Sequence, residues 1–213
     1  MRPPCTKTLR NSAFTLLLLL PGALQAQNTI HYDAQPGSKI RIDGTSTFHD
    51  WTAEANMIGG FMEVDPAFDA DLKTLTTTPK VEVTILVRQL KNPKNEPTMD
   101  KRMHSELKQQ DHPSIQYRLL NLTPKTDATA GSASQFDAKG ELTISGVTRT
   151  NSMPVSFERI DKSKIKVKGA TALKMSDFGI KPPSFLGAMR TGDEVKLTFE
   201  WITAKAEKTA AAK

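Results

Sequence analysis

The sequence has 213 residues, 38% of them hydrophobic, which is enough for one domain with a substantial core. Lysine and arginine outnumber aspartate and glutamate by only 29 to 23, an excess too small to indicate a nucleic-acid-binding protein. The single cysteine, Cys5, excludes a framework of disulfides within the chain.

The first 26 residues have the pattern of an export signal. Arg2, Lys7 and Arg10 precede an apolar run at 13–20, and a signal-peptidase site ends at Ala26. The run is shorter than the roughly 20 apolar residues that cross a bilayer, so we expect cleavage rather than a retained anchor. The sequence therefore predicts a periplasmic or secreted protein whose signal peptide, 1–26, is removed.

Apolar and polar residues alternate in segments throughout the remaining chain. Successive side chains of a strand point to opposite faces, so this pattern predicts antiparallel strands with one buried face each. We expect one further long strand region at 48–64, bent or bulged at Gly59-Gly60, and a tight connection at Gly146. The alternating segments are 39–42, 81–88, 115–119, 141–144, 155–158, 164–168 and 195–201.

One helix is predicted at 98–109. Thr98 can cap its first turn, and Met99, Met103 and Leu107 fall four residues apart on one face. Helix-capping residues and an apolar stripe of this kind indicate a short helix that packs against the sheet.

The sequence contains no internal repeat and no linker, which favours a single domain at 27–205. Residues 123–134 are rich in Thr, Ala, Ser and Gly and are predicted to form a loop. The alanine- and lysine-rich segment 206–213 is expected to be a flexible tail.

The triplet Asp177-Phe178-Gly179 has the letters of the magnesium-binding motif of protein kinases. A kinase also needs a glycine-rich phosphate loop, an HRD catalytic loop and an APE segment, and the sequence has none of these. We therefore interpret the triplet as the end of a strand followed by a turn. The histidines show no metal-ligand spacing and no GxSxG motif occurs, so no metal site, catalytic residue or cofactor is predicted.

Four segments, taken together and in this order, resemble the YceI-like family. They are IDGTSTFHDW at 42–51, DHPSIQYRL at 111–119 after the predicted helix, GELTISGVTR at 140–149 and SDFGIKPPSF at 176–185. The resemblance covers about residues 29–203. It departs from the family pattern at Lys174, because many members carry an arginine shortly before the DFG triplet.

The resemblance implies an all-β fold with one short helix: a lipocalin-like antiparallel β-barrel of about eight strands around an elongated apolar cavity. It implies a protein that is not an enzyme and that holds a long-chain isoprenoid or another long-chain amphiphile, for carriage or storage. A prenyl quinone and a polyprenyl phosphate are both ligands of the expected type. Transient contact with a membrane and a homodimer remain open.

Two alternatives also remain open. The first is an enzyme that acts on such a lipid, with His49, His104 and Tyr117 as the polar groups nearest the headgroup. The second is a barrel with a filled interior that serves as an interaction module, because alternation alone does not distinguish a cavity from a packed core. The side chains expected to line a lipid cavity are Phe48, Trp51, Val83, Ile85, Val87, Met99, Met103, Tyr117, Leu119, Ile144, Phe157, Phe178, Phe185, Leu197, Phe199 and Trp201.

Overall fold

The computed structural model describes residues 28–125, 133–185 and 189–207, without the side chains of 185 and 189. The predicted signal peptide and most of the predicted tail lie outside these ranges. The elements in chain order are β1 (Ile30–Ala34), β2 (Lys39–Ser46), β3 (Trp51–Ala55), β4 (Gly59–Val64), α1 (Pro66–Ala70), β5 (Lys80–Leu86), the 3-10 turn η1 (Val87–Gln89), α2 (Pro97–Glu106), β6 (Ser114–Pro124), β7 (Ser134–Ile144), β8 (Val147–Arg159), β9 (Lys164–Lys174), the 3-10 turn η2 (Met175–Phe178), β10 (Ser184–Phe185) and β11 (Met189–Lys205).

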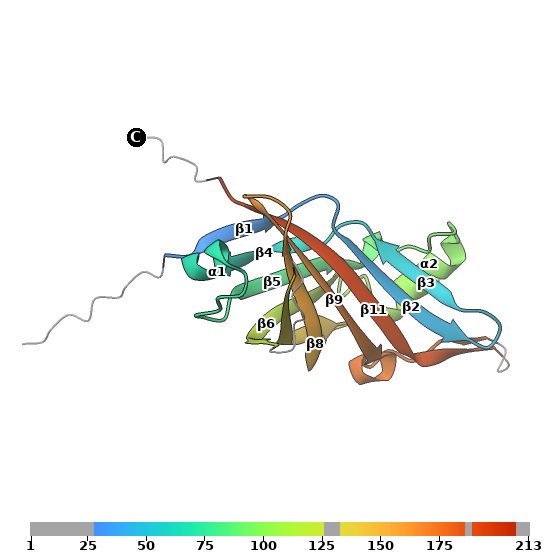
Figure 1. The fold of residues 1–213 in the computed structure, drawn as a ribbon. Helices are drawn as coiled ribbons and strands as arrows, with labels where there is room; N and C mark the ends of the chain where they lie inside the picture. Colours follow the sequence, from blue (N-terminus) through green and yellow to red (C-terminus); the bar gives the residue numbers. More distant parts are fainter. Residues whose placement is uncertain (1–27, 126–132, 186–188, 208–213) are drawn as a thin grey trace, which may run out of the picture.

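Eight antiparallel strands close into a barrel in the order β1, β4, β5, β6, β7, β8, β9 and β11, and β11 returns to β1 (Figure 1). The predicted barrel of about eight strands, with a short helix, is confirmed. The alternation that predicted it is visible in β7, where every second residue from Ser134 to Ile144 is buried and Gln135, Asp137, Lys139, Glu141 and Thr143 between them are not. Each strand thus turns one apolar face to the interior.

One edge of β11 serves two partners in succession. Near its end, Thr203–Lys205 pairs with β1, whereas Val195–Glu200 pairs with β2. Strand β2 then pairs with β3, whose other edge makes, within the described ranges, only an isolated bridge between Glu54 and Lys91. At one end the barrel is closed by the pairing of β11 with β1. At the opposite end β11 pairs with β2 instead, and the β2–β3 hairpin and α2 form the wall there (Figure 1).

The segment 48–64, expected to be one strand region, forms two strands with different partners. Strand β3 pairs with β2, and β4 pairs with β1 and β5. The chain changes partner between them, at Asn56–Ile58, where Ile58 turns into the core. Gly60 adopts a φ of 121° next to the backbone of β5, which explains why glycine stands at the start of β4.

The connection at Gly146 is the predicted tight turn. Ile144 and Val147 are paired across it, and Ser145 and Gly146 have φ values of 52° and 82°. Two successive positive φ values are the geometry of a two-residue hairpin that follows the twist of its strands.

Helix α2 differs in detail from the prediction. It begins at Pro97 rather than Thr98, and its N-cap residue, Glu96, makes no side-chain capping hydrogen bond. Proline suits this first position because its fixed φ is helical and its missing N–H has no partner there. The helix ends at Glu106, before the predicted limit, since Lys108 adopts a positive φ of 52°.

A second helix, α1, was not predicted and covers the end of the barrel where β1 begins and β11 ends (Figure 1). Asp65 caps it by accepting a hydrogen bond from the Phe68 amide at 2.9 Å. Phe68 is fully buried, and its ring packs 5.9 Å from Phe136 and 5.4 Å from Phe157 between ring centroids. These three aromatic rings close this end of the interior.

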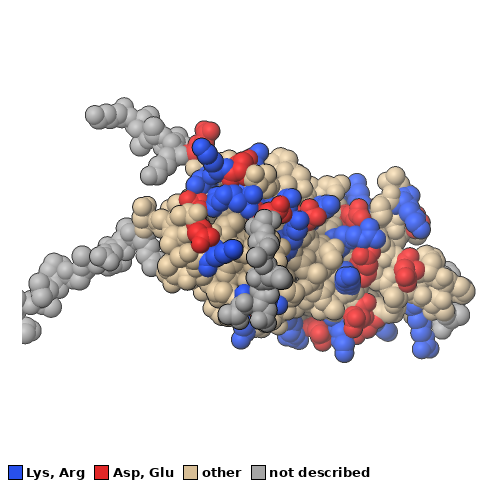
Figure 2. Space-filling view, viewed as in Figure 1, with Lys and Arg blue, Asp and Glu red and all other residues tan. Residues whose placement is uncertain are grey.

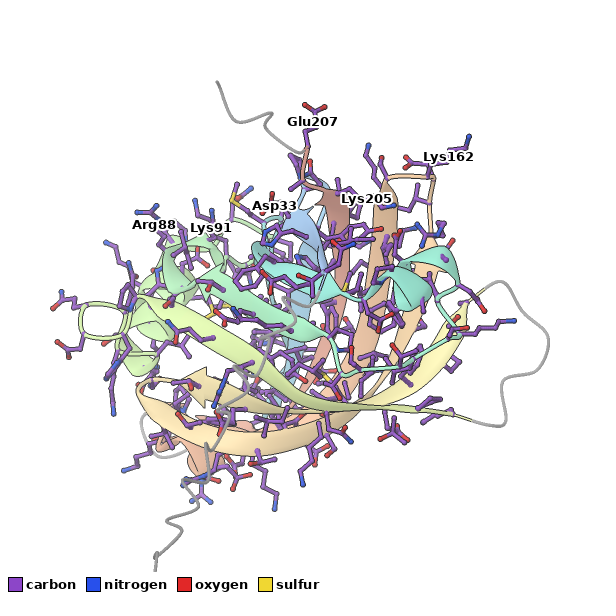
Figure 3. The ribbon with its side chains drawn as sticks, turned by 90° about the vertical axis from the view of Figure 1, so that its left-hand side faces the viewer. Asp33, Arg88, Lys91, Lys162, Lys205 and Glu207 are labelled. Carbon is purple, nitrogen blue, oxygen red and sulfur yellow. The ribbon has the colours of Figure 1, made fainter. Side chains whose placement is uncertain are left out.

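A polar cluster lies between α1 and the two strands that close the barrel. Asp69 accepts hydrogen bonds from Tyr32 and, at 2.8 Å, from Lys205, whose place at this end is labelled in Figure 3. The Arg159 guanidinium donates to the Asp69 carbonyl and lies 3.7 Å from its carboxylate. The helix is thereby fastened to β1, β8 and β11.

Asp177 and Phe178 of the DFG triplet lie in η2, directly after β9, and Gly179 follows it, so the predicted strand end and turn are confirmed. Gly179 ends the turn in the left-handed region with a φ of 68°, and Phe178 is buried while Asp177 is exposed. Asp193 fixes the turn by accepting a hydrogen bond from the Ser176 amide at 2.8 Å. No helix among the described residues is long and apolar enough to cross a membrane.

Candidate functional site

A cavity of about 820 Å³ occupies the interior of the barrel. Strands β2 to β9 and β11 all contribute to its wall, together with α2. The inward residues of β11 show how the sequence builds it, because Val195, Leu197, Phe199 and Trp201 all line the cavity whereas Lys196 is exposed. The deep wall is almost wholly apolar, with Asn151 and Thr171 as a polar pair joined by a hydrogen bond of 3.4 Å.

Most of the side chains predicted to line a cavity are brought together in this wall. They are Trp51, Val83, Ile85, Met99, Met103, Tyr117, Leu119, Ile144, Phe157, Leu197, Phe199 and Trp201. Whether a lipid contacts them remains a prediction.

Three other candidates lie elsewhere, which corrects their assignment. Phe48 is 68% exposed in the β2–β3 loop, because strand alternation does not continue through a turn. Val87 is buried in η1, just after β5 ends, and Phe178 is buried in η2; both pack in the core without reaching the cavity. The side chain of Phe185 lies outside the described residues.

Several lining residues were absent from the prediction although the alternation contained their signal. Ile40, Ile42, Val155, Val167 and Val195 all belong to the alternating segments and face the cavity. The contributions of Asn151 and Thr171 had no such signal, since a polar residue in an alternating strand is expected to face solvent.

The cavity opens at the end of the barrel that carries α2. Lining residues that are also exposed mark this mouth: His49 in the β2–β3 loop, Glu96 and Arg102 around α2, and Arg190 in β11. Arg102 donates a hydrogen bond of 2.9 Å to the Ser184 carbonyl, which joins α2 to β10 across the opening. With Glu106, these are the ionisable side chains of the lining other than Tyr117, so charge is concentrated at the mouth.

Helix α2 is held by few contacts. None of its residues is fully buried, and Met99 and Met103 lie on the cavity. The His104 ring nitrogen donates to the Leu90 carbonyl at 2.7 Å, and Asp100 accepts from the Asn92 amide at 2.7 Å. A helix attached by polar contacts and flexible methionines can adjust when the cavity is filled.

Three aromatic polar atoms in the wall have no hydrogen-bond partner among the described residues: Trp51 Nε1, Tyr117 Oη and Trp201 Nε1. Burial raises the pKa of the Tyr117 hydroxyl to about 12. These atoms are inaccessible to solvent, so the rings present hydrocarbon rather than polar atoms to the cavity.

The polar groups of the enzyme alternative do not assemble. His49 lies at the mouth, Tyr117 lies in the wall and His104 is engaged with Leu90. Across the described ranges no hydrogen bond joins any two of the three, and no group of three His, Cys, Asp or Glu side chains could hold a metal ion.

Three solved structures that share this fold are distant in sequence. BcnA from Burkholderia cenocepacia is 16% identical, with a TM-score of 0.61 over 78% of this chain and 95% of that one. A polyisoprenoid binding domain from Saccharophagus degradans, implicated in plant cell wall breakdown, is 13% identical, with a TM-score of 0.61 over 83% and 99%. The YCEI protein of Campylobacter jejuni is 19% identical, with a TM-score of 0.52 over 71% and 82%.

No curated protein sequence matches the chain. The sequence profile of the YceI-like domain matches residues 33–202, which is most of the chain and nearly all of the barrel. The protein therefore belongs to the YceI-like family.

Proposed function

We propose that this protein is an exported carrier or store for a long-chain isoprenoid lipid of the prenyl quinone or polyprenyl phosphate type. The chain of the lipid lies in the barrel interior and its head lies at the mouth beside α2. The observation that carries this proposal is the apolar cavity of about 820 Å³ whose charged groups are confined to one end.

Size and polarity both support this proposal. Pockets that bury most of a small ligand have volumes of about 300–1,000 Å³ and are mainly apolar, with a few polar groups. Burying the chain of an amphiphile here removes apolar surface from water, which stabilises the complex by about 25 cal/mol for each Å² buried. The head stays near Arg102, Arg190 and His49 at the mouth. The polyisoprenoid-binding domain of Saccharophagus degradans supplies a precedent on the same fold.

The two alternatives receive less support. An interaction module was expected to have a filled interior, and the cavity counts against it. An enzyme needs an acid, base or nucleophile pair within reach of a substrate, and His49 and Tyr117 form no such pair.

Export and the nature of the partners are parts of the same proposal. The signal at 1–26 supports delivery to the periplasm or the medium, where a lipid carrier meets membranes only transiently. Acidic and basic side chains are interspersed over the face shown in Figure 2, which does not favour nucleic acid as a partner.

Extraction of the purified protein with organic solvent, followed by mass spectrometry, tests the proposal. Delipidated protein is then offered a prenyl quinone and a polyprenyl phosphate in separate titrations. Recovery or uptake of one prenyl chain per protein is expected. A protein that is empty when purified and rejects both added lipids would contradict the proposed function.

A further inference from the structure

Three glycines in the barrel wall lie beneath aromatic rings that line the cavity. Gly44 and Trp51 are direct partners across β2 and β3, and Gly169 and Phe199 are direct partners across β9 and β11. The third glycine, Gly140 on β7, lies next to the ring of Tyr117 on β6.

Each of these glycines is required by the position of its ring. A Cβ atom added at any of the three would lie closer than 3.0 Å to ring atoms, and at Gly169 the nearest would be Phe199 Cε1 at 2.6 Å. Side chains do not approach this closely, so any other residue would displace the ring. Since the Cβ would project from the inner face of the wall, it would drive the ring toward the cavity.

Hydrogen bonding does not explain why two of these rings lie where they do. Trp51 Nε1 and Tyr117 Oη are buried without a partner in the described structure, although an unpaired buried donor is unfavourable. Both rings instead fit against bare backbone, which the missing glycine side chains expose. The arrangement holds bulky rings against the wall and leaves the space in front of them free.

The three pairs widen the cavity at different places. Gly44 is opposite Val195 of β11 and Gly169 is opposite Phe199, a separation of four residues or about 13 Å along the strand. Tyr117 lies on β6, across the eight-strand ring from β11. The glycines therefore widen the cavity on two opposite sides and at more than one position along its length.

We propose that Gly44, Gly140 and Gly169 determine ligand specificity by keeping the cavity wide enough for a methyl-branched isoprenoid chain. The methyl branches of such a chain give it a larger cross-section than a straight acyl chain. With side chains at these positions, the displaced rings would leave room only for the thinner, unbranched chain. This inference rests on the proposed function and adds the feature of the wall that selects the chain.

The test compares Gly140→Ala and Gly169→Ala with the unchanged protein. Each is titrated with a prenyl quinone and with an unbranched fatty amide, and melting temperature reports folding. We expect prenyl quinone affinity to fall roughly tenfold or more, because single methylene differences in apolar pockets have effects of this order, while the unbranched chain binds nearly as before.

Removing the ring provides the rescue. In the double variant Gly140→Ala with Tyr117→Leu, the added methyl group no longer meets a ring, so prenyl quinone binding should return toward the original value. Gly59→Ala is the matched control, since Gly59 is also in a strand but its nearest neighbour is the Thr84 carbonyl oxygen at 3.3 Å rather than a ring.

Two results would overturn the inference. One is a folded Gly140→Ala or Gly169→Ala protein that binds the prenyl quinone as well as the original does. The other is equal loss of both ligands without recovery in the double variant, which would mean that the glycines serve folding alone.

A neutral apolar dye, N-phenyl-1-naphthylamine, separates this inference from the proposed function. If the original protein takes up the dye but neither lipid, the proposed function fails. The dye still measures the cavity width, because its uptake should fall in the single variants and recover in the double variant. Unchanged dye uptake throughout would overturn the glycine inference.

Discussion

Tyr32 donates a hydrogen bond to the Asp69 carboxylate and so ties the first strand of the barrel to the helix that covers its end. Burial alone would raise the pKa of Asp69, but hydrogen bonds from Lys205 and Tyr32 outweigh it, and the pKa lies below its usual range. A carboxyl whose pKa is lowered by folding stabilises the folded state above its unfolded pKa. That contribution is lost as the pH falls through the folded value.

Asp69→Asn should therefore make the free energy of unfolding less sensitive to a fall in pH. We expect the free energy of unfolding to fall by about 1–3 kcal/mol at pH 7, because Lys205 and Tyr32 lose a charged acceptor. Below the unfolded carboxyl pKa of about 3.9, the difference between the two proteins should shrink. Urea titrations at several pH values measure the free energy of unfolding of both proteins. A difference between the two that stays the same at every pH would contradict this prediction.

Phe68→Ala should destabilise the barrel by about 3–5 kcal/mol, because the fully buried ring packs between Phe136 and Phe157 and its loss leaves a void. Phe48→Ala is the matched control, since Phe48 is 68% exposed and its loss should change stability by less than about 0.5 kcal/mol. Chemical denaturation compares the two. Similar losses in both variants would show that α1 does not seal the core.

Leu197→Trp should reduce lipid uptake while the barrel stays folded. Leu197 faces the cavity, where the larger side chain can occupy free space. In a packed core the same change would cost roughly 1–3 kcal/mol. Lys196→Gln, at an exposed neighbour on the opposite face, is the control and should change neither property. Melting temperature and bound prenyl lipid are measured together, and a large loss of stability in Leu197→Trp would contradict an open cavity at this position.

Amide hydrogen exchange in α2 should slow when lipid is bound. Met99 and Met103 border the cavity, and the helix is otherwise held mainly by the polar contacts of Asp100, Arg102 and His104. Filling the cavity supplies apolar contacts that oppose local opening. The amides of β1 serve as the internal reference, because β1 contributes no residue to the cavity lining. Unchanged exchange in α2 with lipid bound would mean that the helix is a fixed plug.

The mature protein is expected to begin at Gln27, after removal of the signal. Intact mass of the protein recovered from the periplasm or medium decides this. A mass that retains the apolar run at 13–20 would indicate an anchored protein instead.

The strands and most of the cavity wall followed from alternation because a barrel strand places every second residue on the inner face. This pattern was enough to predict Phe157 and Leu197 in the wall, and Ile40, which the prediction omitted, has the same signal. Alternation fails where a strand ends, and Phe48, Val87 and Phe178 lie in such places: a loop and two 3-10 turns. Their apolar character was visible in the sequence, but the direction of their side chains depends on turns whose geometry is set by distant neighbours.

For a similar reason, local pattern did not predict the division of 48–64 into β3 and β4 or the existence of α1. Strand pairing decides where the chain changes partner, and pairing is a long-range property that local pattern does not contain. Helix α1 is only five residues long, and its Asp65 cap and Pro66 start are weak signals on their own. The role of the glycines next to Trp51, Tyr117 and Phe199 could not be predicted from local pattern either, since it depends on rings from neighbouring strands.

The double pairing of β11 has a consequence for how this chain reaches its native state. Strand β11, which completes the sheet, is synthesised after the strands that it joins, and it must pair with β9, β2 and β1. Until then those strands have unpaired backbone edges that can associate with other chains. A topology dominated by contacts between distant segments folds slowly. A chain truncated before Met189 would therefore be expected to aggregate rather than to form a smaller barrel.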